Sequence, residues 1–323
     1  MAMPAKAALA GTQGQSYTEK PLVGIGLKTL SVAVFVCMST LIKASGELPT
    51  GQISFFRSFF ALFPLIVIFA IRGQLQTVFR TDRPFGHAWR AIVGVASMWL
   101  SFYGLTHLPL PEAITLNYAQ PLAVVVLGVL IGETVRIYRW SAVILGFAGV
   151  VIVSWPNLSF FSGNGGASRS EAFGALAILA AAFLSAIAML FVRLLVKTEK
   201  SATVAFYFSL NAAILSLLTF PFGWETPTLQ QALCLVGAGI CGGIAQLLLT
   251  ESYRHAELST IAPFEYTSLL LAIASGYFFF DEIPTVYTIV GGAIVIAAGL
   301  FVIWRERRLG LPRGAARKVV LPH

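Results

Sequence analysis

Several polar side chains interrupt long apolar runs of this sequence, where they could bind a small molecule. Asn117, Tyr118 and Gln120 stand next to Pro121 in the middle of one such run. On a helix, Asn117 and Gln120 would share a face, because they are three residues apart. Pro121 lacks an N–H and would free a backbone carbonyl one turn earlier. These groups could bind the ammonium and carboxylate of an amino acid. Alternatively, they could simply hydrogen-bond a neighbouring helix.

A second polar group follows Glu265 in another apolar run and includes Thr267 and Ser268. A carboxylate at membrane depth could pair with a substrate ammonium, or could carry a coupling proton if its pKa were raised. It could equally be a structural partner for a cation such as Lys28 or for backbone donors. Both interpretations of Glu265 remain open from the sequence. Lys28 itself is expected to face water near the end of its run, as is Glu133.

Arg57 is a cation well inside an apolar run. Its guanidinium could bind a carboxylate through two parallel hydrogen bonds. The sequence favours a structural role instead, in which the side chain extends to the outer surface or pairs with Glu47 or Glu112. The remaining candidates are Trp99, Tyr103 and Gln246, although aromatic residues near helix ends often mark the membrane interface. The predicted substrate-binding residues are Asn117, Tyr118, Gln120, Trp99, Tyr103, Gln246, Glu265 and Thr267, with Glu265 and Arg57 as possible coupling or structural charges.

These side chains must be positioned by helices that cross a membrane. The chain has 323 residues, of which 57% are hydrophobic and 11% charged. Water-soluble domains carry about 25% charged residues, so lipid must surround this protein. Ten runs are long enough to span a bilayer, which needs about 20 apolar residues. They are Leu22–Ile42, Ile53–Ile71, Ala88–Leu105, Pro111–Ile131, Trp140–Trp155, Phe173–Leu195, Thr203–Phe222, Leu229–Leu249, Leu258–Phe280 and Val286–Trp304. The sequence predicts an all-α integral membrane protein.

The basic residues predict the orientation of these helices. If the N-terminus is cytoplasmic, the cytoplasmic loops and tails hold all of the 22 Lys and Arg residues except Lys43, Arg57 and Arg169. Such enrichment is typical of the cytoplasmic side. It also explains the net charge of +8 without nucleic acid. We therefore expect a multi-pass protein of the cytoplasmic (inner) membrane, with both termini in the cytoplasm.

The two halves of the sequence resemble each other at an offset of about 150 residues. Lys43 corresponds to Arg193, Gly132-Glu133 to Asp281-Glu282, and Trp155 to Trp304. Each half contains five predicted helices, and an odd number requires the second half to enter the membrane from the opposite side. Inverted repeats of this kind are typical of secondary transporters that work by alternating access. The predicted divisions are a tail (1–21), the first repeat (22–156), an extracytoplasmic linker (157–172), the second repeat (173–304) and a basic cytoplasmic tail (305–323).

The sequence resembles the EamA-type domain of the drug/metabolite transporter superfamily, present in two copies. The resemblance rests on Lys43, Arg57, Pro121, Gly132-Glu133, Ala142, Gly146 and Gly149. One departure is that Leu270 stands where the second copy should have its proline, with Pro263 seven residues earlier. The sequence therefore does not establish that helices 4 and 9 bend at equivalent points. The resemblance implies export of amino acids or related metabolites from the cytoplasm, and more narrowly resembles exporters of aromatic and other amino acids.

Other classes of function fit the sequence less well. No phosphate-binding loop of the Gly-x-x-x-x-Gly-Lys-Ser/Thr type is present, and the four histidines fall in loops or at the chain end. We therefore expect no enzyme activity, no cofactor and no metal, and a monomer or weak dimer. Transport of a nucleotide-linked or vitamin-like metabolite is the alternative. An anionic substrate would need several cavity cations, and Arg57 alone lies well inside a predicted helix, which favours a small zwitterion or neutral compound. Gly239 and Gly243 are expected to pack closely on a helix of the same chain or, alternatively, on a second copy.

Overall fold

The computed structural model describes residues 21–73, 79, 81–130, 137–158, 168–195, 199, 201–255 and 262–308. All regular elements within this part of the chain are helices. They are α1 (Pro21–Ala44), α2 (Thr50–Ile71), α4 (Pro84–His107), α5 (Leu110–Asn117), α6 (Ala119–Leu130), α7 (Ile137–Leu158), α8 (Arg169–Leu195), α9 (Ser201–Leu217), η2 (Phe220–Phe222), α10 (Leu229–His255), η3 (Ala262–Tyr266), α12 (Thr267–Phe280) and α13 (Val286–Arg308). Glu133 and most of the predicted tails and linker lie outside the described residues.

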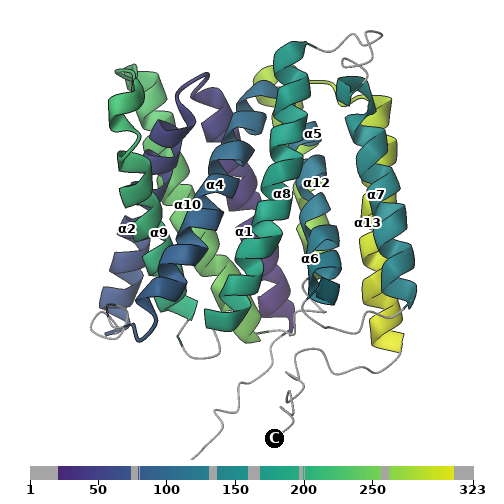
Figure 1. The fold of residues 1–323 in the computed structure, drawn as a ribbon, viewed down its shortest axis with the longest axis horizontal. Helices are drawn as coiled ribbons and strands as arrows, with labels where there is room; N and C mark the ends of the chain where they lie inside the picture. Colours follow the sequence, from purple (N-terminus) through teal and green to yellow (C-terminus); the bar gives the residue numbers. More distant parts are fainter. Residues whose placement is uncertain are drawn as a thin grey trace, which may run out of the picture.

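These elements form the predicted bundle of ten helices, in which the fourth and the ninth are each built from two pieces. The fourth helix consists of α5 and α6, and the ninth of η3 and α12. Figure 1 shows that α1 begins and α13 ends at the same end of the bundle. We call this the terminal end, and the end that carries Ala44 and Thr50 the opposite end.

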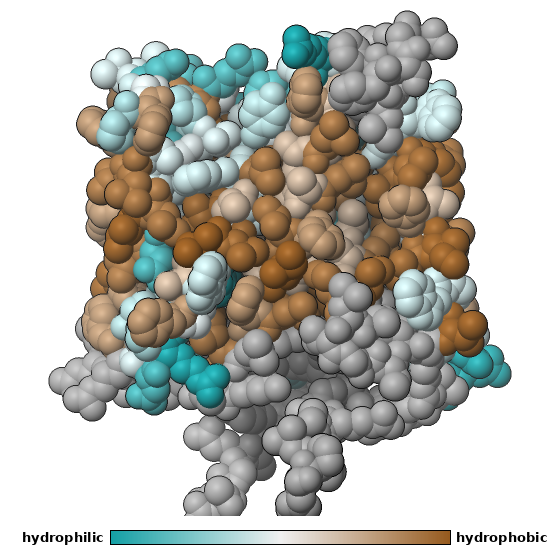
Figure 2. All heavy atoms as spheres, in the orientation of Figure 1, coloured by the Kyte–Doolittle hydropathy of each residue, from teal (hydrophilic) through white to brown (hydrophobic). Residues whose placement is uncertain are grey.

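The outside of the bundle is apolar, as expected of a protein surrounded by lipid. Figure 2 shows a broad hydrophobic band across the molecule, with more polar residues toward its ends. Large side chains such as Phe63, Leu270 and Phe278 are more than half exposed on this surface. Five helices, α1, α2, α8, α10 and α13, are by length and composition sufficient to cross a membrane. Such a surface is stable only when lipid covers it.

The helix contacts obey the two-fold symmetry expected of an inverted repeat. The first helix, α1, packs on the eighth, α10, while the third, α4, packs on the sixth, α8. In the repeat, helix 1 corresponds to helix 6 and helix 3 corresponds to helix 8. The contact between helices 1 and 8 is therefore equivalent to the contact between helices 6 and 3. Three further contacts join a helix to its own counterpart: α7 with α13, α2 with α9, and α5 with α12. The two halves are therefore interleaved around a common core.

The predicted close approach at Gly239 and Gly243 occurs within the chain, between α10 and α2. A Cβ on Gly239 would lie 2.9 Å from the carbonyl oxygen of Phe56, and one on Gly243 would lie 2.7 Å from that of Ala61. Only glycine allows the two backbones to come this close. The prediction of packing within the monomer is confirmed.

The fourth and ninth helices break at equivalent points, which the sequence left open. Helix 4 breaks at Tyr118, between α5 and α6, and helix 9 breaks at Tyr266, between η3 and α12. The two tyrosines are separated by the repeat offset, to within two residues. Pro121 follows the first break and Pro263 precedes the second, each by three residues. Different proline placements thus accompany the same break.

Candidate substrate site

A partly open cavity of about 270 Å³ lies between helices of the bundle. Residues of α1, α2, α4, α6, α8 and α9 line it, and so both halves of the chain contribute to its wall. The polar and charged residues of the wall are Arg57, Arg90, Ser97, Ser101, Gln120 and Ser185. The rest of the wall is formed mainly by methionine, phenylalanine and small residues. Pockets that bind small molecules combine an apolar wall with a few polar groups in this way.

Arg57 reaches this cavity from the eighth position of α2. Its guanidinium packs beside Gly242 of α10, where a Cβ would lie 3.3 Å from its Nε. The Nε atom is buried and has no hydrogen-bond partner. The side chain thus lies in neither of the places that the structural role predicted, since it neither extends to the outer surface nor pairs with Glu47 or Glu112. The absence of a side chain at Gly242 makes room for the guanidinium.

Arg90 is a second cavity cation, which the sequence did not identify. The predicted helix began at Ala88 and put Arg90 at its cytoplasmic edge, whereas α4 begins at Pro84 and places Arg90 two turns inside. The guanidinium Cζ lies 3.5 Å from the ring centroid of Phe208 on α9. Phe208 can take this position because Gly94 has no Cβ, which would lie 2.8 Å from the ring. The Nε and Nη1 atoms of Arg90 are buried and have no hydrogen-bond partner.

Two hydroxyl groups of the wall, those of Ser97 and Ser185, have partners of their own. Ser97 Oγ donates to the carbonyl oxygen of Ala181 at 2.8 Å and lies 2.7 Å from Ser185 Oγ. These bonds join α4 to α8 at the side of the cavity. Gln120, one of the predicted residues, also lines the cavity from α6. Among the residues that the structure describes in this wall, the buried donors without partners therefore belong to Arg57 and Arg90.

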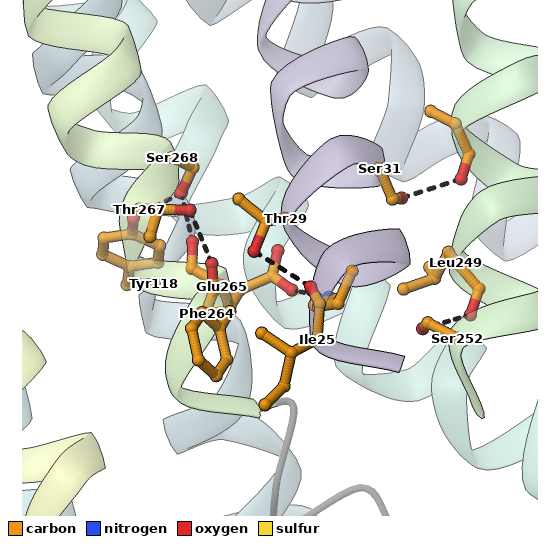
Figure 3. Close-up of polar contacts among 12 residues, drawn as sticks. Ile25, Thr29, Ser31, Tyr118, Leu249, Ser252, Phe264, Glu265, Thr267 and Ser268 are labelled. Atoms are coloured by element: carbon orange, nitrogen blue, oxygen red, sulfur yellow. Dashed lines mark hydrogen bonds and ion pairs between the residues drawn. The ribbon is translucent and has the colours of Figure 1, made fainter. Parts of the chain in front are cut away.

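A second polar cluster surrounds the two helix breaks (Figure 3). The Tyr118 hydroxyl lies 2.5 Å from Ser268 Oγ, and Ser268 donates its own proton to the carbonyl oxygen of Glu265 at 2.7 Å. Tyr118 is consequently the donor in the first bond. Its ring also meets that of Tyr266 edge-on, at a centroid distance of 5.4 Å. This cluster ties α12 to the break in helix 4, and Tyr118 is not among the residues that line the cavity.

Glu265 forms an ion pair with Lys28 of α1. The residue Lys28 is only 4% exposed, which corrects the expectation that it faces water. The carboxylate side chain remains 53% exposed. This ion pair agrees with the structural interpretation of Glu265, a partner for a buried lysine, and the coupling role stays a prediction. Thr267, beside it, donates to the carbonyl oxygen of Phe264 at 2.7 Å.

The other predicted residues lie apart from the lining of the cavity. Asn117 Nδ2 donates to Ala113 of its own helix at 3.3 Å, and Trp99 Nε1 donates to Ser216 Oγ at 3.4 Å. Tyr103 stacks on His107 at 4.2 Å, and Gln246 is half-buried on α10. Of the predicted set, the structure thus brings Gln120 and Arg57 to the cavity, and it brings Tyr118, Glu265 and Thr267 to the second cluster.

An ion pair that the sequence did not predict joins α1, α5 and the segment between α12 and α13 at the opposite end. Lys43 Nζ at the end of α1 lies 2.8 Å from Glu282 Oε1, and it also donates to the carbonyl oxygen of Leu108. The second carboxylate oxygen of Glu282 accepts a 2.8 Å hydrogen bond from the backbone N–H of Leu110, where α5 begins. We call this group the opposite-end latch. It holds α1, α5 and the segment between α12 and α13 together.

Comparison with known proteins agrees with this architecture. The sequence model of the EamA-like transporter family matches residues 22–155 and again 172–305. The chain is 29% identical to an S-adenosylmethionine uptake transporter of Rickettsia bellii, over 88% of this chain and 95% of that protein. It is 26% identical to the pseudopaline exporter CntI of Pseudomonas aeruginosa (85% and 94%) and 27% identical to a riboflavin transporter of Vibrio cholerae (79% and 82%). A protein of known crystal structure shares the fold, with a TM-score of 0.63 and 20% identity over 89% of this chain and 99% of that one. The chain therefore belongs to the EamA-like transporter family and is a transporter of small metabolites.

Proposed function

We propose that this protein is a secondary transporter that exports amino acids or related metabolites across the cytoplasmic (inner) membrane by alternating access. The observation that carries the proposal is the cavity inside the bundle, which both repeats line and into which Arg57 and Gln120 project. Polar groups at membrane depth are costly unless they serve a substrate or a partner. A central site between inverted repeats is the arrangement that alternating access requires.

The opposite-end latch supports this mechanism. Lys43, Glu282 and the start of α5 close the bundle at that end, while α5 also packs against α12. Release of substrate at the opposite end requires these contacts to separate. In the orientation proposed from the basic residues, the terminal end is cytoplasmic. The structure then corresponds to a state closed to the outside, in which an exporter would take up its cargo.

A second candidate is a larger metabolite, because relatives are named for S-adenosylmethionine and for riboflavin. The sequence argument against an anionic metabolite, such as a nucleotide-linked one, no longer holds, since Arg90 joins Arg57 in the cavity. Size favours the first candidate. The cavity of about 270 Å³ lies near the lower end of the range of about 300–1,000 Å³ typical of small-molecule sites.

Reconstitution tests the proposal directly. The purified chain in liposomes should move radiolabelled amino acids in a saturable manner, and an imposed pH gradient will show whether protons are coupled. Loading the label inside or outside determines the direction. Saturable movement of S-adenosylmethionine or riboflavin, with no movement of any amino acid, would contradict the proposal and support the second candidate. If Glu265 carried the coupling proton, Glu265→Gln would abolish the effect of the gradient.

A further inference from the structure

The cavity carries an excess of positive charge. Arg57 and Arg90 both line it, whereas none of the residues that the structure describes in its wall is acidic. A buried charge without a counter-ion is costly, because the protein interior replaces the solvation of water poorly. Two like charges in one small cavity also repel each other. The residues that the structure describes in the wall therefore leave the charge of the two arginines uncompensated.

Packing holds the two guanidiniums in place. Among the described residues, no polar group does so. Arg90 stacks on the ring of Phe208, and Arg57 lies beside the bare backbone of Gly242. Neither guanidinium forms a hydrogen bond or an ion pair with the part of the chain that the structure describes, and three of their N–H-bearing atoms are buried without a partner. Arg72, at the other end of α2, provides the contrast, since both its Nη atoms contact the Glu251 carboxylate at 3.2–3.3 Å.

We propose that Arg57 and Arg90 together bind the anionic head of the substrate, and that the cavity selects acidic metabolites over zwitterions. A planar guanidinium matches a carboxylate, which can accept two parallel N–H bonds. A substrate with two negative charges would neutralise both arginines, whereas a zwitterionic amino acid would leave their charge uncompensated. The inference rests on the proposed transport function. It replaces the preference for a zwitterion or neutral compound that the sequence alone suggested.

Carboxylates and phosphates share the chemistry that two arginines recognise. Matched pairs of probes separate these sources. Glutamate and glutamine, like aspartate and asparagine, have nearly the same shape and differ by one carboxylate. O-phosphoserine and serine differ by a phosphate. The carboxylate pairs test an acidic amino acid as the substrate, and the phosphoserine pair tests a phosphorylated one.

Binding of these probes to the purified full-length chain in detergent should show the preference. A hydrogen bond to a charged group contributes enough for wild type to bind each acid about 10- to 100-fold more tightly than its neutral counterpart. Arg57→Gln and Arg90→Gln should each remove most of that preference. Arg57→Lys and Arg90→Lys should restore part of it, because lysine keeps the charge without the planar fork. Arg72→Gln, on the same helix as Arg57 but outside the cavity, is the matched control and should change nothing.

Gel filtration establishes whether each variant is folded, and the lysine variants serve where a glutamine variant is not. Equal binding by wild type of the charged and the neutral member of all three pairs would overturn the inference, as would an undiminished preference in folded Arg57 and Arg90 variants. Selection of O-phosphoserine over serine, with no selection within the two carboxylate pairs, supports the anion site and identifies phosphate as its ligand. Transport in liposomes distinguishes the two proposals. If acids and amides are transported equally well, only the proposed selectivity is contradicted. If no compound of the panel is transported, the proposed function is contradicted as well.

Discussion

The opposite-end latch offers a direct test of how the bundle opens. In Glu282→Gln the side chain keeps its shape but loses the charge that pairs with Lys43 at 2.8 Å. The amide oxygen can still accept the 2.8 Å hydrogen bond from the backbone N–H of Leu110. The substitution therefore removes the electrostatic attraction and leaves most of the packing unchanged. We expect it to favour opening at this end.

The size of the effect follows from the burial of the pair. At 2.8 Å and an effective dielectric constant of about 20, the gross attraction between the two charges is about 6 kcal/mol. Desolvation cancels much of it, and breaking a fully buried pair costs about 3–5 kcal/mol. Since the side chains of Lys43 and Glu282 remain 12% and 16% exposed, we expect a net loss of about 2–3 kcal/mol. Opening at this end should become about 30- to 150-fold more favourable.

Hydrogen–deuterium exchange at the start of α5 measures this opening, because the Leu110 N–H is bonded to Glu282. Its exchange should accelerate by a similar factor in Glu282→Gln, as expected when local opening limits exchange. Lys43→Met should accelerate it as well, and the double variant should show less than the sum of the two effects, because the substitutions break the same pair.

A matched control is the exposed pair of Arg72 and Glu251, whose arginine side chain is 41% exposed. Surface pairs contribute at most about 1 kcal/mol, so Arg72→Gln should leave exchange at the start of α5 unchanged. Exchange in Glu282→Gln that stays within about twofold of wild type would refute the assignment of the latch. Strictly additive effects in the double variant would show that Lys43 and Glu282 act independently.

Two further predictions concern stability. Gly243→Ala should destabilise the protein by about 1–3 kcal/mol, because the added Cβ would lie 2.7 Å from a carbonyl oxygen of α2. Thermal unfolding in detergent will measure this loss. Gly26→Ala is the control and should not be destabilised, because its Cβ has free space. Burial would raise the pKa of Glu199, but hydrogen bonds from Thr81 and His87 outweigh it and hold that pKa below its usual value. This carboxylate therefore stabilises the folded state near neutral pH, and the contribution is lost as pH falls through the lowered pKa. Glu199→Gln should unfold at a lower temperature than wild type at pH 7, with a smaller difference at acidic pH; a difference independent of pH would contradict the assignment.

Most of the fold could be predicted from hydropathy and spacing. A segment that crosses a membrane must pair its backbone hydrogen-bonding groups internally and is therefore helical. A long run of apolar residues thus predicts a spanning helix almost directly. The helix ends were harder to place. The run assigned to Thr203–Phe222 contains α9, which ends at Leu217, followed by the short helix η2 before Gly223 at a φ of +95°. Hydropathy does not change at this point, because the residues past the end of α9 remain apolar.

The candidate site was less predictable, because it depends on which faces of different helices meet. Arg90 and Lys28 both stand near the ends of their helices, where a basic residue usually reaches water. Arg90 turns inward because Gly94 has no side chain, so that the ring of Phe208 can stack on the guanidinium. Lys28 is buried because it forms an ion pair with Glu265 on η3. Each partner is more than 100 residues away in the sequence. No local pattern contains that information.

The two helix breaks show how the symmetry of the fold fixes local structure. A proline explains the break in helix 4, since Pro121 cannot donate to the carbonyl of Asn117. It does not explain the break in helix 9, where Pro263 comes before Tyr266 and Leu270 follows it. The two breaks nevertheless place Tyr118 and Tyr266 ring against ring, and α5 and α12 pack together on the side of the latch. Because the contact is between counterparts of the two repeats, a break in one helix leaves room for its partner only if that partner breaks at the same level. The two helices therefore break at equivalent positions of the repeat, although only the break in helix 4 has a proline that explains it.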